Sequence, residues 1–142
     1  MTQVLESDLD AFRSSFTGQV ILARDTDYDS ARSLWNGCFD RHPTVIARCY
    51  SPADVAAAIA FGREQDLEIS VRGGGHSFSG VSITDGSLTI DLSQLHEVVV
   101  DPAARRTRCG GDHRSRPRRG LPATRPGSNH RNDQPYQCGW ST

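Results

Sequence analysis

Residues 67–80 read LEISVRGGGHSFSG, and this stretch decides how the rest of the chain is interpreted. Apolar and polar residues alternate from Leu67 to Arg72, which indicates a half-buried strand. Three consecutive glycines follow at once, and glycine lets a backbone adopt positive φ angles and approach a ligand closely. The stretch therefore predicts a strand that leads into a glycine-rich loop held by a rigid scaffold.

This loop is a candidate phosphate-binding site. Successive main-chain N–H groups in such a loop form a concave nest for phosphate oxygens, and the hydroxyl group of Ser77 adds a further donor. Glycine-rich loops without a named motif are often only turns, so on pattern alone both interpretations stay open. His76 likewise fits a solvated loop histidine or one that donates to a backbone carbonyl.

Two common nucleotide-binding motifs are excluded. A Rossmann fingerprint requires a glycine at the sixth position of its loop, and the sixth residue counted from Gly73 is Phe78. A Walker loop requires Lys and then Ser or Thr after its last glycine, whereas Gly80 is followed by Val81 and Ser82. The chain contains no lysine, since all 16 basic residues are arginine, and this also excludes a Schiff-base lysine.

A helix is expected upstream of the loop. Ser51 is a good N-cap, because its hydroxyl oxygen accepts from an otherwise unpaired N–H group. Pro52 suits the first helical position, and Asp54 lies near the positive end of the helix dipole. The alanine-rich run at 55–61 has high helix propensity, and the helix is expected to end near Asp66.

The remaining elements indicate a compact α+β unit. Helical spacing predicts two short helices before the first long strand, and β-branched residues predict the strands. The expected helices lie at 5–16, with Ser7 and Asp8 near its start, and at 29–35; the expected strands lie at 20–22, 44–49, 87–92 and 97–101, with a turn at 101–104 and a returning hairpin strand at 105–108.

Composition limits the classes of partner. The formal net charge of -1 gives no global reason to expect nucleic acid or an anionic membrane. No cysteine belongs to a CxxC pair, so a zinc ribbon is unsupported, no metal site is predicted, and the four cysteines are expected to be free thiols. The N-terminus does not resemble a signal peptide, and no segment approaches the roughly 20 apolar residues that span a bilayer, so a cytoplasmic location is expected.

Several stretches resemble the FAD-linked oxidases of the berberine bridge enzyme type, within the vanillyl-alcohol oxidase and p-cresol methylhydroxylase (PCMH) superfamily. They are VRGGGHSFSG at 71–80, CYSPADVAAAIAFGREQDLEISV at 49–71 and LTIDLSQLHEVVVDPAARRTR at 88–108. LARDTDYDSARSLWNGCFDRHPTVIARC at 22–49 is similar to the opening segment of the family. The resemblance covers residues 5–108 and implies the N-terminal part of a PCMH-type FAD-binding domain, a small subdomain that contains a βαβ unit.

The resemblance also implies a cofactor and its contacts. Main-chain N–H groups of the loop would bind the FAD pyrophosphate, and His76 would join the flavin covalently through its 8α-methyl carbon. A neutral imidazole nitrogen is a competent nucleophile near neutral pH. The family oxidises alcohols, amines or sugar-like substrates and passes the electrons to O₂. The cofactor-binding residues predicted in this way are Gly73, Gly74, Gly75, His76, Ser77 and Gly80.

The resemblance implies an incomplete enzyme. Family members are several times longer, and their second FAD-binding stretch, substrate domain and catalytic base lie beyond the region that this sequence resembles. No catalytic residue is assigned here. The expected organisation is an N-terminal segment at 1–42, a partial FAD-binding domain at 43–108 and an irregular tail at 109–142, with FAD and a small-molecule substrate as the partners of the complete enzyme.

The tail differs in composition from the rest of the chain. Residues 109–142 contain no Val, Ile, Phe or Met but carry six arginines and four prolines, a composition typical of disorder. A frameshift near codon 109 also explains the change, because codons exist for 116–120, 124–128, 129–135 and 138–142 that encode family-like sequences one base later. That hypothesis predicts that restoring one base in the coding DNA recovers the family sequence.

Two other functions stay open for the chain. The clustered arginines of the tail would suit an arm that binds nucleic-acid phosphates without sequence preference, although the aromatic residues of a single-strand platform are few. Alternatively, the whole chain is a non-enzymatic module for a phosphate-bearing ligand. Purified protein that is yellow and carries acid-stable flavin would favour the oxidase over the nucleic-acid arm and over the non-enzymatic module.

Overall fold

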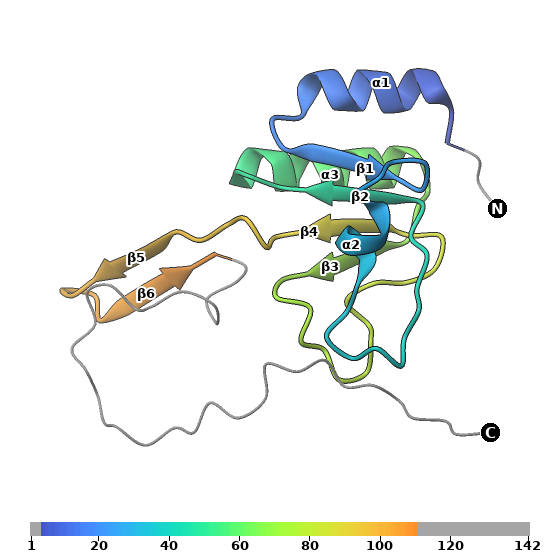
Figure 1. Cartoon of the computed structure of the whole chain (residues 1–142). Coiled ribbons are helices and arrows are strands. Elements are labelled where there is room, and N and C mark those ends of the chain that lie inside the picture. Colours follow the sequence, from blue (N-terminus) through green and yellow to red (C-terminus); the bar gives the residue numbers. More distant parts are fainter. Residues whose placement is uncertain (1–3, 111–142) are drawn as a thin grey trace, which may run out of the picture.

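The computed structural model describes residues 4–110, and it confirms the α+β fold. A four-stranded sheet in the order β1-β2-β4-β3 carries helices on both faces, and a separate β5-β6 hairpin extends away from it (Figure 1). The elements are α1 Glu6–Ser15, β1 Gln19–Leu22, α2 Tyr28–Arg32, β2 Val45–Arg48, α3 Pro52–Glu64, β3 Ile69–Arg72, β4 Leu88–Asp91, β5 Val98–Asp101 and β6 Arg106–Cys109.

The sheet is mixed, and its parallel strands end at a common edge. β1 pairs antiparallel with β2, while β4 runs parallel to β2 on one side and to β3 on the other. α3 connects β2 to β3, and β4 lies between these two strands. Arg48, Asp91 and Arg72 consequently occupy one row across the last positions of the three parallel strands, directly before the glycine-rich loop.

The two faces of the sheet bury two apolar clusters. The larger cluster lies between the sheet and helices α1 and α3, and the smaller one lies beneath α2 on the opposite face (Figure 1). The larger contains Leu9, Phe12, Phe16, Leu22, Val45, Ala47, Cys49, Ala58, Phe61, Leu88 and Ile90, and the smaller contains Ile21, Tyr28, Ala31 and Ile46. Alternate residues of β2 therefore point to opposite cores, which explains the continuous apolar run of this strand.

The start of α3 is capped as the sequence predicts. The hydroxyl oxygen of Ser51 accepts from the Asp54 main-chain N–H at 3.2 Å, and the Asp54 carboxylate accepts from the Ser51 N–H at 3.0 Å. This reciprocal capping box satisfies two N–H groups that the helix itself leaves unpaired. The helix ends at Glu64, close to the expected Asp66, whose positive φ of 51° ends the helical path.

Asp54 connects three parts of the fold. Its carboxylate is 2% exposed and also accepts from the Thr17 N–H at 2.9 Å, the Thr17 hydroxyl at 2.7 Å and the Tyr50 N–H at 3.0 Å. Burial by itself raises the pKa of Asp54, but hydrogen bonds from Thr17, Tyr50 and Ser51 outweigh it and lower the pKa to about 2. The ionised carboxylate therefore joins the α1–β1 connection to the start of α3.

β3 is half-buried, as its alternating pattern predicts, although one apolar and one polar residue lie differently from the rest. Ile69 packs against the larger apolar cluster, whereas Val71 on the same face is 52% exposed and Ser70 on the opposite face is 5% exposed. β3 is an edge strand, and the buried Ser70 hydroxyl hydrogen-bonds to those of Ser87 at 3.0 Å and Thr89 at 2.9 Å. These paired hydroxyl groups make the burial of Ser70 acceptable.

Both short helices have boundaries that the sequence missed. α1 begins at Glu6, ahead of Ser7 and Asp8, without a side-chain cap. α2 ends at Arg32, whereas helical spacing predicted a helix through residue 35; Ser33 is extended, with a ψ angle of 129°. The residues that follow α2 pack instead against the glycine-rich loop, so tertiary contacts override their helical spacing.

The hairpin matches the prediction. β5 pairs antiparallel with β6 from Val98↔Cys109 to Asp101↔Arg106. The connecting turn is closed by the Asp101 carboxylate, which accepts from the Ala104 N–H at 2.9 Å. The predictions for the arginine-rich tail, including the frameshift and the nucleic-acid arm, concern residues 111–142, which lie outside the described range.

The cysteine prediction holds for one residue and fails for another. Cys49 is a buried free thiol, and burial, with added repulsion from Asp54 and Asp91, raises its pKa to about 12. Cys38 is disulfide-bonded, so the expectation of a free thiol was wrong there.

No helix between residues 4 and 110 combines the length and the apolar character needed to cross a membrane. Within the same range, no group of three or more His, Cys, Asp or Glu side chains is arranged to hold a metal ion.

Candidate functional site

The glycine-rich loop of residues 73–80 follows β3 directly and lies beside the connection from α2 to β2 (Figure 1). Gly75 and Gly80 have φ angles of 68° and 71°, so the positive φ expected of the three consecutive glycines occurs only at the last of them, and Gly80 adds a second such position. Both glycines are buried, whereas His76, Phe78 and Ser79 are exposed. The loop thus has an inner edge against the fold and an outer edge toward solvent.

The outer edge offers main-chain donors. Within residues 4–110, the N–H groups of 73–77 donate no hydrogen bond to another group. A run of N–H groups without partners among the described residues carries partial positive charge and is a suitable binding surface for an anion. The hydroxyl groups of Ser77 and Ser79 lie 3.4 Å apart on the same loop and add two polar groups.

Residues 35–39 hold the inner edge of the loop, and we call them the bracing segment. The Trp35 N–H donates to the Gly75 carbonyl at 3.2 Å, and the Asn36 side-chain Nδ2 donates to the Phe78 carbonyl at 2.8 Å. Asn36 is 6% exposed, and its Oδ1 accepts from the Cys38 N–H at 3.2 Å. Sequence reasoning missed these residues because their contacts are 40 or so positions away in the chain.

Gly80 is fixed by the bracing segment as well. A Cβ atom added at this glycine would lie 2.6 Å from Cγ of the Phe39 ring, closer than two carbon atoms can approach. The structure shows close packing of Gly80 against Phe39, while its role as a cofactor-binding residue stays a prediction. That packing sets where the loop ends.

The contact between Gly80 and Phe39 leads to a stability prediction. We expect Gly80→Ala to lower the free energy of unfolding by about 2–4 kcal/mol, since left-handed φ costs an alanine about 1–2 kcal/mol and the overlap with Phe39 adds to it. Urea denaturation of the purified chain measures the change. Gly86→Ala is the matched control, because Gly86 has a φ of 73° but nothing within 4 Å of its added Cβ. Equal losses in the two variants would contradict the packing role.

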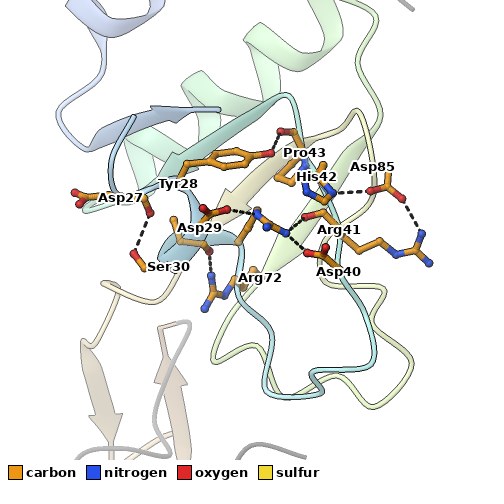
Figure 2. Close-up of polar contacts among 12 residues, drawn as sticks. Asp27, Tyr28, Asp29, Ser30, Asp40, Arg41, His42, Pro43, Arg72 and Asp85 are labelled. Carbon is orange, nitrogen blue, oxygen red and sulfur yellow. Dashed lines mark hydrogen bonds and ion pairs between the residues drawn. The ribbon is translucent and has the colours of Figure 1, made fainter. Parts of the chain in front are cut away.

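Arg72 anchors the first residues of the loop. Its side chain turns back from the end of β3, and Nη1 donates to the Ala31 carbonyl of α2 (Figure 2). A Cβ atom at Gly75 would lie 3.3 Å from the Arg72 Nε, so the loop folds closely over this guanidinium. Asp91, in the adjacent position of β4, pairs with Arg48 at 3.2 Å and places a negative charge between the two arginines.

His76 lies on the exposed outer edge. Its ring centroid is 6.4 Å from that of Trp35, and the ring planes are tilted by 54°. Within residues 4–110, its imidazole makes no hydrogen bond, so the interpretation as a donor to a backbone carbonyl finds no support there. An exposed imidazole next to unpaired N–H groups is accessible to a ligand on the loop.

A cavity of about 230 Å³ lies beneath α2, apart from the outer edge of the loop. Arg32 lines it and pairs with Asp29 at 2.8 Å and with Asp40. Two carboxylates face one guanidinium, so the charged groups that line the cavity sum to -1, which does not suit an anionic ligand. The loop is therefore the better candidate site.

Comparison with known proteins identifies several relatives. Residues 43–111 match a family described as FAD binding domain. The chain is 38% identical over 97 residues to (R)-6-hydroxynicotine oxidase of Paenarthrobacter nicotinovorans, which covers 68% of this chain and 21% of that protein. It is 36% identical over 76 residues to glucooligosaccharide oxidase of Sarocladium strictum, which covers 52% of this chain and 15% of the relative.

Solved structures agree with the fold. The crystal structure of 6-hydroxy-D-nicotine oxidase from Arthrobacter nicotinovorans superposes with a TM-score of 0.63 at 38% identity, over 68% of this chain and 21% of that one. BBE-like 1 of Physcomitrella patens superposes with a TM-score of 0.62 at 22% identity over the same shares, which supports the fold alone. The chain spans about a fifth of the length of these relatives.

Proposed function

This chain belongs to the FAD-linked oxidoreductases whose FAD binding domain matches residues 43–111, and from that premise we propose that its glycine-rich loop binds the diphosphate of FAD. The single observation that carries the proposal is the row of main-chain N–H groups at 73–77, which have no hydrogen-bond partner within residues 4–110. Such groups neutralise phosphate charge without a lysine or a metal ion, and the sequence contains no lysine.

The residues of the loop fit the cofactor. Gly75 has a left-handed φ and is buried over Arg72, so the backbone turns there without a side chain in the way. Ser77 contributes a hydroxyl donor next to the N–H groups. The loop lies at the carboxyl ends of the parallel strands β2, β3 and β4, the edge at which ligands bind in sheets of this kind.

His76 is proposed as the covalent anchor of the flavin. Its imidazole is exposed, makes no hydrogen bond within residues 4–110 and lies on the same loop as the proposed phosphate donors. A neutral imidazole nitrogen has the lone pair needed to form a bond to the 8α carbon of the flavin. The family resemblance of RGGGH at 72–76 adds to this assignment.

The complete protein is proposed to oxidise an amine, an alcohol or a sugar-like substrate. When bound, FAD supplies the redox chemistry, taking two electrons from the substrate and passing them to O₂. This chain would bind and orient the cofactor through its loop, while the substrate-binding parts belong to the four-fifths of the relatives that it does not span. We propose that residues 1–142 are inactive by themselves.

Titration of the purified chain with flavins tests the proposal. We expect the flavin fluorescence to change as FAD binds. FAD should bind at least about tenfold more tightly than riboflavin, which lacks phosphates, because phosphate contacts supply most of the affinity. Gly74→Glu, which places a carboxylate among the N–H groups, is expected to abolish the difference. Equal binding of FAD and riboflavin would contradict the loop assignment, and salt-sensitive binding of DNA without flavin binding would favour the nucleic-acid arm.

A further inference from the structure

Two peptide groups of the loop have their orientation set by the bracing segment. A trans peptide is planar, and its C=O and N–H bonds point in opposite directions; the described chain contains no cis peptide bond. The Gly75 carbonyl accepts from the Trp35 N–H, so the N–H of His76 in the same peptide points away from the bracing segment. The Phe78 carbonyl accepts from Asn36 Nδ2, so the Ser79 N–H also points away.

These orientations decide whether the loop attracts or repels an anion. A peptide turned over by half a rotation would present its carbonyl oxygen, which carries partial negative charge, at the outer edge. Next to glycine such a turn meets little steric resistance, and the Gly75–His76 peptide begins at a glycine, whereas the Phe78–Ser79 peptide lies between two residues with side chains. The hydrogen bond to the Gly75 carbonyl therefore opposes an otherwise easy turn, and the one to the Phe78 carbonyl fixes the second peptide in the same sense.

Asn36 is suited to this task because both ends of its amide are used inside the fold. Its Nδ2 holds the loop carbonyl at 2.8 Å, and its Oδ1 is itself held by the Cys38 N–H at 3.2 Å. A buried side chain that is bonded at both ends has one orientation. The exposed positions of His76 and Ser79 agree with N–H groups that face solvent on the other side.

We infer that Asn36 is a positioning residue for the glycine-rich loop. Together with the Trp35 main chain, Asn36 turns the amides of His76 and Ser79 toward the diphosphate. The inference rests on the proposed function and deepens it. It adds the Ser79 amide to the phosphate donors and assigns a role to a segment that precedes the matched residues 43–111. No contact between Asn36 and the cofactor is required.

Asn36→Asp is the sharpest test. Aspartate keeps the size of the side chain and an oxygen for the Cys38 N–H, but it replaces the Nδ2 donor with an oxygen that repels the Phe78 carbonyl. Thr17→Val is the matched control for stability, since Thr17 donates to the buried Asp54 and lies outside the loop and its bracing segment. Each variant is compared with the unaltered 142-residue chain by melting temperature, FAD titration and ¹⁵N relaxation of residues 76–80.

We expect Asn36→Asp to weaken FAD binding by at least about tenfold, a change that corresponds to one lost charge-assisted hydrogen bond. It should also increase the motion of residues 76–80 in the absence of flavin. Thr17→Val should lower the melting temperature while leaving the FAD dissociation constant within about twofold. Unchanged FAD affinity in Asn36→Asp, or an equal loss in Thr17→Val, would overturn the inference.

The relaxation measurement separates this inference from the proposed function. If the unaltered chain binds no FAD, the proposed function fails for this chain, whereas the loop data still decide on Asn36. Unchanged order of residues 76–80 in Asn36→Asp then overturns the positioning role, and increased motion limited to that loop supports it.

Discussion

Asp54→Ala is expected to lower the free energy of unfolding by about 3–5 kcal/mol, which is a large part of the stability of a small domain. The substitution removes an ionised acceptor that is buried and leaves the N–H groups of Thr17, Tyr50 and Ser51 without a partner. An unpaired buried donor costs about 1–3 kcal/mol. Denaturation in urea, followed by circular dichroism, measures the loss.

The control for this variant is Asp10→Ala. Asp10 lies on the exposed side of α1, and its substitution is expected to change stability by no more than about 0.5 kcal/mol. A loss below about 1 kcal/mol in Asp54→Ala would show that the hydrogen bonds around this carboxylate do not hold the first part of the chain to α3.

The same carboxylate gives an acid dependence with a definite sign. Because hydrogen bonds outweigh burial and lower the folded pKa of Asp54 to about 2, from the ordinary value of 3.8, its contribution is complete above pH 4 and is lost as the pH falls through 2. The shift corresponds to about 2 kcal/mol. Asp54→Asn should lack this part of the acid dependence, so the difference between the two stability curves isolates it from the surface carboxylates.

His76→Ala is expected to remove covalent flavin completely. The measurement requires a protein that contains the remaining parts of the enzyme, such as a chimera in which residues 5–108 replace the matching segment of (R)-6-hydroxynicotine oxidase. Flavin should stay on the unaltered chimera after acid precipitation, because a covalent bond survives denaturation. It should be undetectable on His76→Ala, because the imidazole is the group proposed to form that bond to the flavin. Non-covalent FAD should still be retained through the loop N–H groups.

His42→Ala serves as the control, because His42 is exposed and both of its hydrogen bonds among the described residues use its main chain: the N–H donates to the Asp85 carboxylate and the carbonyl accepts from the Gly86 N–H. This variant is expected to keep covalent flavin. Acid-stable flavin on the His76→Ala chimera would locate the covalent bond elsewhere and remove the assigned role of this residue.

Local sequence signals predicted most of the elements. The helix α3 was predictable because Ser51, Pro52 and Asp54 are capping residues whose effect is short in range. The hairpin of β5 and β6 was predictable from valines on one side of an Asp-Pro turn. Both signals depend only on neighbours in the chain, and both elements appear where they were expected.

Contacts that are distant in the chain account for what could not be predicted. The burial of Ser70 depends on the hydroxyl groups of Ser87 and Thr89, which are distant in the chain. Asn36 followed by Gly37 is typical of a turn, and nothing in the spacing indicates that its amide reaches residue 78. The glycine-rich loop itself was evident, whereas the segment that orients it was not.

The central claim is that the main-chain amides of residues 73–79 bind the diphosphate of FAD. Titrating ¹⁵N-labelled chain with FAD and with ADP, and following the amide resonances, tests it most directly. We predict that both ligands shift the amides of 73–79 most strongly and that riboflavin leaves them unchanged, since only FAD and ADP carry the diphosphate. Shifts that avoid this loop, or that appear equally with riboflavin, would contradict the claim.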